Sequence, residues 1–192
     1  KAPYFAHMKP QVPTQYSKLD DPLVDAEGIE ETSEDDLWFL PGPMEEERIV
    51  EIGKTLAGTL DKVHRHGLLH RDVKPANILI SREGRIHLID FGFATQIHNS
   101  KHSTVGTYLY SAPEQMKALH APVDQRSDLY ALGGVLYACA TGEPPYSSED
   151  SAELSRLHAS APVPRVVDKN INISPALSQI IEKCLAKDPG DR

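Results

Sequence analysis

The sequence predicts a mainly helical α+β fold that contains one small β-hairpin. Apolar residues recur at helical spacing over residues 45–63, and helical patterns return between residues 128 and 186. Two short strand-prone runs flank a polar turn between residues 78 and 89. The chain has 192 residues, of which 40% are hydrophobic, so it is long enough for one domain with a buried core.

The N-terminal segment lacks these patterns. Prolines at positions 3, 10, 13, 22 and 41 interrupt it, and Glu30–Asp36 is an acidic run. Residues 1–48 contain 12 acidic and 4 basic side chains, whereas residues 49–192 contain 16 of each. We therefore expect residues 1–42 to form an acidic, proline-containing linker, with an acidic docking tail as the alternative. Within this segment, Ser33–Leu40 is compatible with a short helix capped by its serine.

Regular structure is predicted to start at residue 43. Glu45, Glu46 and Glu47 occupy the first turn of a helix, where acidic side chains favour the positive end of the helix dipole. This helix ends near Gly67. Its apolar face consists of Ile49, Ile52, Leu56, Leu60 and Val63.

Two strands and three helices are predicted after this first helix. The strands Ile78–Ile80 and Arg85–Ile89 are joined by a turn over residues 81–84. The last predicted helix has Ser174 as its cap and Pro175 at its first position. The three helices cover Asp128–Ala140, Ser148–Ala159 and Ser174–Ala186.

Three motifs in the second half of the chain occur in a characteristic order. Residues 70–77 read His-Arg-Asp-Val-Lys-Pro-Ala-Asn, residues 90–92 read Asp-Phe-Gly, and residues 112–114 read Ala-Pro-Glu. In order and spacing they resemble the catalytic loop, metal-binding loop and activation-segment end of eukaryotic-type protein kinases. The resemblance covers residues 43–192 and implies the helical C-terminal lobe of that fold, with the hairpin at the catalytic site.

The resemblance implies roles for four residues of these motifs. Asp72 stands where the family places the base that accepts the proton of the acceptor hydroxyl. Lys74 would balance charge on the transferred phosphate. Asn77 and Asp90 would supply a neutral and an anionic oxygen to Mg²⁺, so the expected cofactors are ATP and Mg²⁺ bound by Lys74, Asn77 and Asp90.

The expected acceptor is a serine or threonine hydroxyl of a protein. Lys74-Pro75-Ala76-Asn77 and Gly106-Thr107 resemble the serine/threonine-specific branch of the family, and the resemblance implies that Thr107 lines the acceptor site near Asp72. Small-molecule kinases share a similar catalytic loop but do not usually carry the Asp-Phe-Gly and Ala-Pro-Glu combination. An arginine before the catalytic aspartate suggests activation-loop phosphorylation, with Ser103 or Thr104 as the hypothesised acceptor.

Two further matches concern the support of the catalytic loop. Asp128 falls where kinases place the aspartate that holds the backbone around the His-Arg-Asp turn, and an ordinary helix cap is the alternative for this residue. Arg192 falls where kinases place the arginine that pairs with the glutamate of Ala-Pro-Glu, here Glu114. The sequence stops at this arginine, so we expect residues 43–192 to be a catalytic C-terminal lobe truncated before the family's last helix.

The sequence departs from the family upstream of the catalytic loop. No glycine-rich GxGxxG motif and no strand lysine of the family pattern precede residue 70, although residues 1–42 could instead contain a remnant of the N-terminal lobe or of the interlobe hinge. We therefore expect this chain alone to be weak or inactive as a kinase. The alternative is a non-catalytic, kinase-like module that binds other proteins.

Composition excludes several other classes of partner. No part of the chain has a basic excess, so nucleic-acid binding is not expected. The longest apolar run, residues 129–140, is too short for a membrane span. Cys139 and Cys184 lack a CxxC partner and are expected to be buried free thiols, which suits a cytoplasmic protein.

Overall fold

The computed structural model describes residues 37–39, 43–81, 83–91, 95–96 and 108–192. Four helices and five short strands lie in these ranges, together with single 3₁₀ turns. The helices are α1 (Glu46–Arg65), α2 (Gln125–Thr141), α3 (Ser151–Ser160) and α4 (Pro175–Cys184). The strands are β1 (Leu37–Phe39), β2 (Leu68–Leu69), β3 (Ile78–Ser81), β4 (Ile86–Leu88) and β5 (Thr95–Gln96). The mainly helical α+β fold predicted from the sequence is confirmed.

Helix α1 forms where the sequence predicts it. Glu46 and Glu47 lie in its first turn, and Lys62, His64 and Arg65 lie in its last turn, so charges of both signs complement the helix dipole. The chain leaves the helix through Gly67, whose φ of 71° is a conformation that glycine adopts without steric cost. All five apolar residues of the predicted face are buried: Ile49, Ile52, Leu56, Leu60 and Val63.

The predicted hairpin supplies two strands of a three-stranded antiparallel sheet with the order β1-β3-β4, in which β3 is the central strand. Ile78 pairs with Leu88, and Ile80 pairs with Ile86. On the other edge of β3, Leu37–Phe39 pairs with Leu79–Ser81. The short helix suggested for Ser33–Leu40 is therefore wrong at residues 37–39, because pairing with the hairpin gives this backbone an extended conformation. A second, two-stranded sheet joins β2 to β5.

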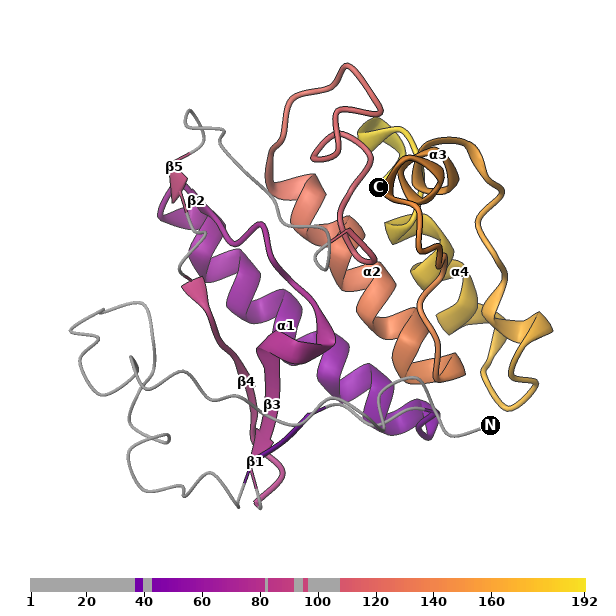
Figure 1. The fold of residues 1–192 in the computed structure, drawn as a ribbon. Helices are drawn as coiled ribbons and strands as arrows, with labels where there is room; N and C mark the ends of the chain where they lie inside the picture. Colours follow the sequence, from indigo (N-terminus) through magenta and orange to yellow (C-terminus); the bar gives the residue numbers. More distant parts are fainter. Residues whose placement is uncertain (1–36, 40–42, 82, 92–94, 97–107) are drawn as a thin grey trace.

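Helix α2 is the centre of the molecule, between α1 on one side and α4 on the other (Figure 1). It begins three residues earlier than the sequence predicts, because the Asp124 side chain caps it by accepting a hydrogen bond from the Arg126 amide. Gly133 lies where α4 approaches most closely: a Cβ atom there would be 2.6 Å from Cβ of Cys184. The absence of a side chain thus lets the two helices pack tightly.

Helices α3 and α4 begin at polar caps. The Asp150 carboxylate accepts a hydrogen bond from the Ala152 amide, which starts α3 three residues later than predicted. Ser174 caps α4 as predicted, because its Oγ accepts a hydrogen bond from the Leu177 amide at 3.2 Å. The Glu46 carboxylate accepts two further hydrogen bonds from Ser174, which lower the pKa of this carboxyl and tie the start of α1 to the start of α4.

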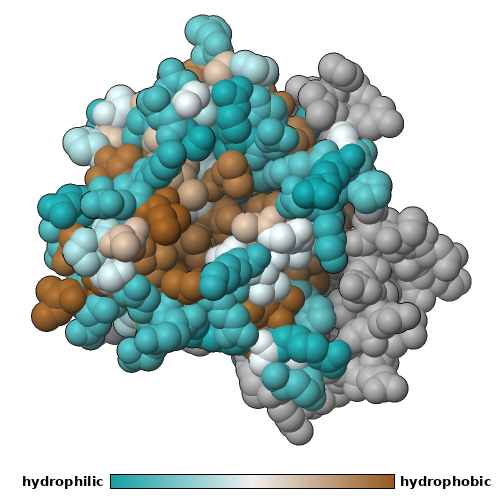
Figure 2. Space-filling model, turned by 180° about the vertical axis from the view of Figure 1, so that it is seen from behind, coloured by the Kyte–Doolittle hydropathy of each residue, from teal (hydrophilic) through white to brown (hydrophobic). Residues whose placement is uncertain are grey.

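The rear face of the molecule carries an apolar area surrounded by polar side chains (Figure 2). Two large apolar side chains of the described residues are exposed, namely Ile171 by 90% and Ile180 by 57%. A single exposed apolar side chain is ordinary on a protein surface. Within the described ranges, no helix combines the length and the apolar character that crossing a membrane requires.

Candidate active site

One buried carboxylate of α2 binds the backbone of the catalytic loop. Oδ2 of Asp128 accepts a hydrogen bond from the His70 amide at 2.9 Å, and Oδ1 accepts one from the Arg71 amide at 2.8 Å. His64, at the end of α1, contacts the same Oδ2 atom through Nε2 at 2.8 Å. Asp128 is 1% exposed and is not the helix cap, which is Asp124. The role that the resemblance implied for this aspartate is therefore confirmed.

Two residues of the site have unusual backbone conformations. Arg71 has a φ of 67° and Asp90 a φ of 65°, both in the left-handed region. For residues other than glycine this conformation costs on the order of 1–2 kcal/mol. It persists only where surrounding contacts hold it, as the hydrogen bond from the Arg71 amide to Asp128 does. Both turns thus store strain directly beside the residues predicted to carry the chemistry.

Asp72, Lys74 and Asn77 meet within hydrogen-bond distance. Nζ of Lys74 lies 2.7 Å from Oδ2 of Asp72, and Nδ2 of Asn77 donates to the same oxygen at 3.0 Å. Nδ2 of Asn77 also donates to the Asp72 carbonyl at 2.8 Å. The other carboxylate oxygen, Oδ1, is buried and has no hydrogen-bond partner among the described residues. One oxygen of Asp72 is therefore fixed, while the second retains its capacity to accept a proton.

The hairpin brings Asn77 and Asp90 to the same end of the sheet. Asn77 directly precedes β3, and the Ile89 amide donates to the Asn77 carbonyl at 2.8 Å, which extends the β3–β4 ladder by one pair. Asp90 is the next residue along the chain. Two residues that are 13 positions apart in the sequence thus become neighbours because the turn between the strands reverses the chain.

His70 connects the catalytic loop to the segment that carries Asp90. It is completely buried, with Nε2 3.2 Å from the Ile89 carbonyl and Nδ1 accepting from the Asp72 amide at 3.3 Å. These contacts require a neutral ring with its proton on Nε2. Burial lowers the pKa of His70, which favours the same neutral form. The ring of Phe91 meets it edge-on, with ring centroids 4.8 Å apart.

Asn77 and Asp90 carry the kind of oxygen donors that suit Mg²⁺. Nδ2 of Asn77 points at Asp72, so the amide oxygen is the atom of this side chain that can take a cation. Together with the Asp90 carboxylate it would form a pair of hard oxygen donors. Mg²⁺ commonly binds one or two such protein groups and completes its shell with phosphate oxygens and water. In the described part of the chain, no group of three His, Cys, Asp or Glu residues forms a further candidate metal site.

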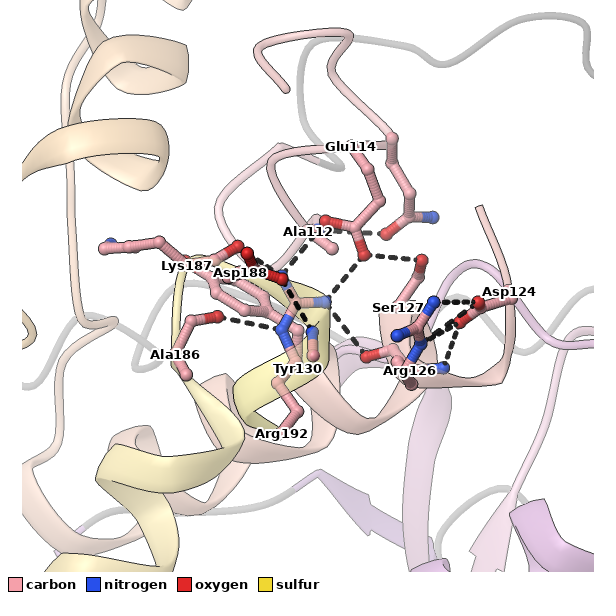
Figure 3. A network of polar contacts seen from close by, with 12 residues as sticks. Ala112, Glu114, Asp124, Arg126, Ser127, Tyr130, Ala186, Lys187, Asp188 and Arg192 are labelled. Atoms are coloured by element: carbon pink, nitrogen blue, oxygen red, sulfur yellow. Dashed lines mark hydrogen bonds and ion pairs between the residues drawn. The ribbon is translucent and has the colours of Figure 1, made fainter. Parts of the chain in front are cut away.

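A second polar network fixes the Ala-Pro-Glu motif (Figure 3). Arg192 donates to both carboxylate oxygens of Glu114, at 2.6 and 3.0 Å, and neither side chain has any exposed surface. Ser127 of α2 also donates to Glu114, at 2.7 Å. The Arg192 guanidinium lies over the Tyr130 ring, 4.7 Å from its centroid. The pairing of Arg192 with Glu114 inferred from the sequence is therefore confirmed.

Several predicted positions fall outside the described residues. These are Gly92 of the metal-binding motif, the candidate phosphorylation sites Ser103 and Thr104, and the predicted acceptor-site residues Gly106 and Thr107. Conversely, the sequence patterns described above assign no role to Gln115 or His64. Gln115 contacts Arg71 across 44 positions of the sequence, and His64 contacts Asp128 across 64 positions. No local sequence pattern reveals contacts of this range.

Comparison with known proteins adds an independent observation. Residues 26–192 match the family model described as "Protein kinase domain". The chain is 37% identical over 168 residues to the serine/threonine-protein kinase PknH of Mycobacterium bovis, which covers 85% of this chain and 28% of that protein. It is 35% identical over 178 residues to PknB of Mycolicibacterium smegmatis, covering 89% of this chain and 28% of that protein.

A third relative is similar to the same degree. PknE of Mycobacterium tuberculosis is 39% identical over 155 residues, which covers 79% of this chain and 27% of that protein. All three relatives are named serine/threonine-protein kinases. The chain therefore spans little more than a quarter of the length of each of these relatives.

Proposed function

The chain belongs to the protein kinase family, and on this basis we propose that it is the catalytic C-terminal lobe of a serine/threonine protein kinase. The reaction is transfer of the γ-phosphate of ATP to a serine or threonine hydroxyl of a protein. The observation that carries the proposal is the state of the Asp72 carboxylate. Its Oδ2 is bound by Lys74 and Asn77, whereas its buried Oδ1 has no partner among the described residues.

Asp72 acts as the proton acceptor. An acceptor hydroxyl bound at Oδ1 would be oriented by the carboxylate and would transfer its proton there as the oxygen–phosphorus bond forms. The hydrogen bonds at Oδ2 hold the carboxylate in one orientation during this step. Lys74, only 23% exposed, keeps a cationic group beside the transferred phosphate.

Asn77 and Asp90 hold the metal–nucleotide complex. Their oxygens are the hard donors that Mg²⁺ prefers, and the hairpin sets the distance between the two backbones. When bound, Mg²⁺ supplies charge neutralisation at the phosphate oxygens. Thr107, which the family resemblance places at the acceptor site, is the proposed fourth catalytic residue.

We propose that residues 43–192 form the catalytic lobe and that this chain by itself transfers phosphate slowly or not at all. No glycine-rich phosphate-binding motif precedes the catalytic loop anywhere in the sequence. Much of the rate of this reaction depends on pre-organised positioning of the phosphates. We also place the protein in the cytoplasm, since its two cysteines are free, which suits a reducing compartment.

Mutation of the proposed base and metal ligand tests this function. In a form of the protein extended upstream in its gene, Asp72→Asn is expected to lower kcat for phosphate transfer by about 10²–10³-fold, because the proton acceptor is lost. Asp90→Asn is expected to raise the Mg²⁺ concentration required for half-maximal rate. The matched control is Asp168→Asn at an exposed carboxylate, which should leave both quantities unchanged.

The outcome is read from kcat and from the Mg²⁺ dependence separately. If Asp72→Asn retains the rate of the unmodified protein, Asp72 is not the base. If Asp90→Asn leaves the Mg²⁺ dependence unchanged, the proposed metal site is wrong. If the extended form transfers no phosphate although it is folded and phosphorylated, a kinase-like binding module replaces the proposed enzyme.

A further inference from the structure

Gln115 makes two hydrogen bonds that connect separate parts of the site. Its Oε1 accepts from the Ala112 amide at 2.9 Å, and its Nε2 donates to the Arg71 carbonyl at 3.0 Å. A backbone amide can only donate and a backbone carbonyl can only accept, so these partners fix the orientation of the side-chain amide. The first contact is local, whereas the second reaches the catalytic loop across 44 positions of sequence.

The Arg71 carbonyl belongs to the peptide group that leads into Asp72. The amide of the same peptide group donates to Nδ1 of His70 at 3.3 Å. Gln115 and His70 therefore hold this peptide plane at its two polar ends, directly before the proposed catalytic base. The preceding amide, that of Arg71, is held by Asp128. Arg71 has a φ of 67°, a conformation that persists only while contacts hold it, and a change in this backbone would reorient Asp72.

The chain next to Gln115 is firmly anchored. The residue before it, Glu114, is bound by the fully buried Arg192 guanidinium and by Ser127 of α2. The backbone of Glu114 is thus fixed to the helical core, and the neighbouring side chain extends from there to the catalytic loop. A glutamine that served only the local turn would need its contact with Ala112 and no donor to Arg71.

We propose that Gln115 is a positioning residue for phosphate transfer, which transmits the anchoring of the Ala-Pro-Glu segment to the peptide that orients Asp72. This inference rests on the proposed kinase function. Gln115 acts through the Arg71 carbonyl and need not touch either substrate. Its loss should therefore reduce kcat and leave the KM values for ATP and for the protein substrate unchanged.

Two substitutions separate the two hydrogen bonds. Gln115→Glu retains an oxygen that can accept from the Ala112 amide but loses the donor to Arg71, whereas Gln115→Met loses both contacts at similar side-chain length. In the upstream-extended protein, each variant is expected to lower kcat by about tenfold, because the half-buried Arg71 carbonyl loses the hydrogen bond that Gln115 donates. The matched control is Gln125→Met at the exposed first residue of α2, which should retain full activity.

The rates are divided by the folded fraction, measured by circular dichroism in the assay buffer. A tenfold lower kcat per folded molecule in both Gln115 variants, with unchanged KM values, supports the proposal. Full kcat in Gln115→Glu, or a loss that disappears after this correction, overturns it. Activity of the unmodified protein together with inactivity of Asp72→Asn shows in the same experiment that the kinase function itself holds.

Discussion

At the scale of single residues, burial decides which histidines can carry charge. His158 of α3 is completely buried, and its Nδ1 lies 2.8 Å from the Tyr130 hydroxyl. Burial lowers the pKa of His158 to about 3, and the Lys187 ammonium nearby acts in the same direction. The Tyr146 ring also contacts the histidine, and Lys187 donates to the Tyr146 hydroxyl. In the folded protein His158 is therefore neutral at physiological pH.

The lowered pKa of His158 makes stability depend on pH. The unfolded protein binds a proton at this histidine below pH 6.5, whereas the folded protein binds it only near pH 3. The free energy of unfolding is thus fully retained above pH 6.5 and falls as the pH decreases toward 3. Between pH 7 and pH 5 we expect His158 to account for a loss of about 2 kcal/mol.

Urea unfolding at these two pH values measures this contribution. His158→Gln removes the titrating group and keeps a polar side chain near Tyr130, so its stability should fall less between pH 7 and pH 5. The buried His70, whose pKa is also lowered, contributes equally to both proteins and cancels in the difference. Equal pH dependence in the two proteins would show that His158 does not titrate in this way.

The sequence reveals contacts between residues that are close in the chain. Asp72, Lys74 and Asn77 lie within five positions of one another, so their spacing alone predicts that they meet, and the structure brings them within 3.0 Å. The contacts of His64 and Gln115 could not be predicted in this way. They depend on how α1 and the Ala-Pro-Glu segment pack around the catalytic loop, and that packing involves distant residues.

At the scale of elements, hydrophobic periodicity predicted the positions of the helices. In one segment, strand pairing replaced the helix that the local sequence suggested. The spacing of apolar residues located α1 within a few residues, because its buried face must repeat with the helical turn. Helix ends were less accurate, since Asp124 and Asp150 determine where α2 and α3 begin. Leu37–Phe39 became a strand because β3 offered an unpaired edge, and no feature of residues 33–40 alone signals this partner.

The close contact between α2 and α4 predicts the effect of adding one methyl group. Gly133→Ala would place its Cβ 2.6 Å from Cβ of Cys184 and 3.3 Å from Cγ of Leu185, so the helices must separate. We expect a loss of about 1–3 kcal/mol in the free energy of unfolding, measured by chemical denaturation.

Gly58 provides the matched control for this substitution. It lies on the exposed side of α1, and a Cβ there would meet no atom within 4 Å. Gly58→Ala should therefore stabilise the protein by about 0.5–1 kcal/mol, because alanine restricts the unfolded chain and favours the helix. Equal effects at the two positions would contradict the packing described for α2 and α4.

At the scale of the whole molecule, the ion pair between Glu114 and Arg192 joins residues 78 positions apart. It connects the segment before α2 to the segment after α4, and both side chains are inaccessible to solvent. Carboxylate and guanidinium compensate each other's loss of hydration only while both are present. The pair thus fixes the relative position of two segments more than it adds net stability.

Removal of one partner should be costly. Arg192→Ala leaves the Glu114 carboxylate buried without its counter-ion, and we expect the free energy of unfolding to fall by about 3–5 kcal/mol in urea denaturation. Arg156→Ala breaks the exposed pair with Glu153, and this control should leave stability nearly unchanged. A small effect of Arg192→Ala would mean that Glu114 finds other partners or reaches water.

Transfer of labelled γ-phosphate from Mg-ATP to a generic serine/threonine substrate tests the central claim most directly. Three proteins are compared: this chain, a form extended upstream in its gene, and the extended form with Asp72→Asn. The account predicts transfer by the extended form, its loss with Asp72→Asn, and little or none by this chain alone. Undiminished transfer by the Asp72→Asn protein, or no transfer by a folded and phosphorylated extended form, would contradict it.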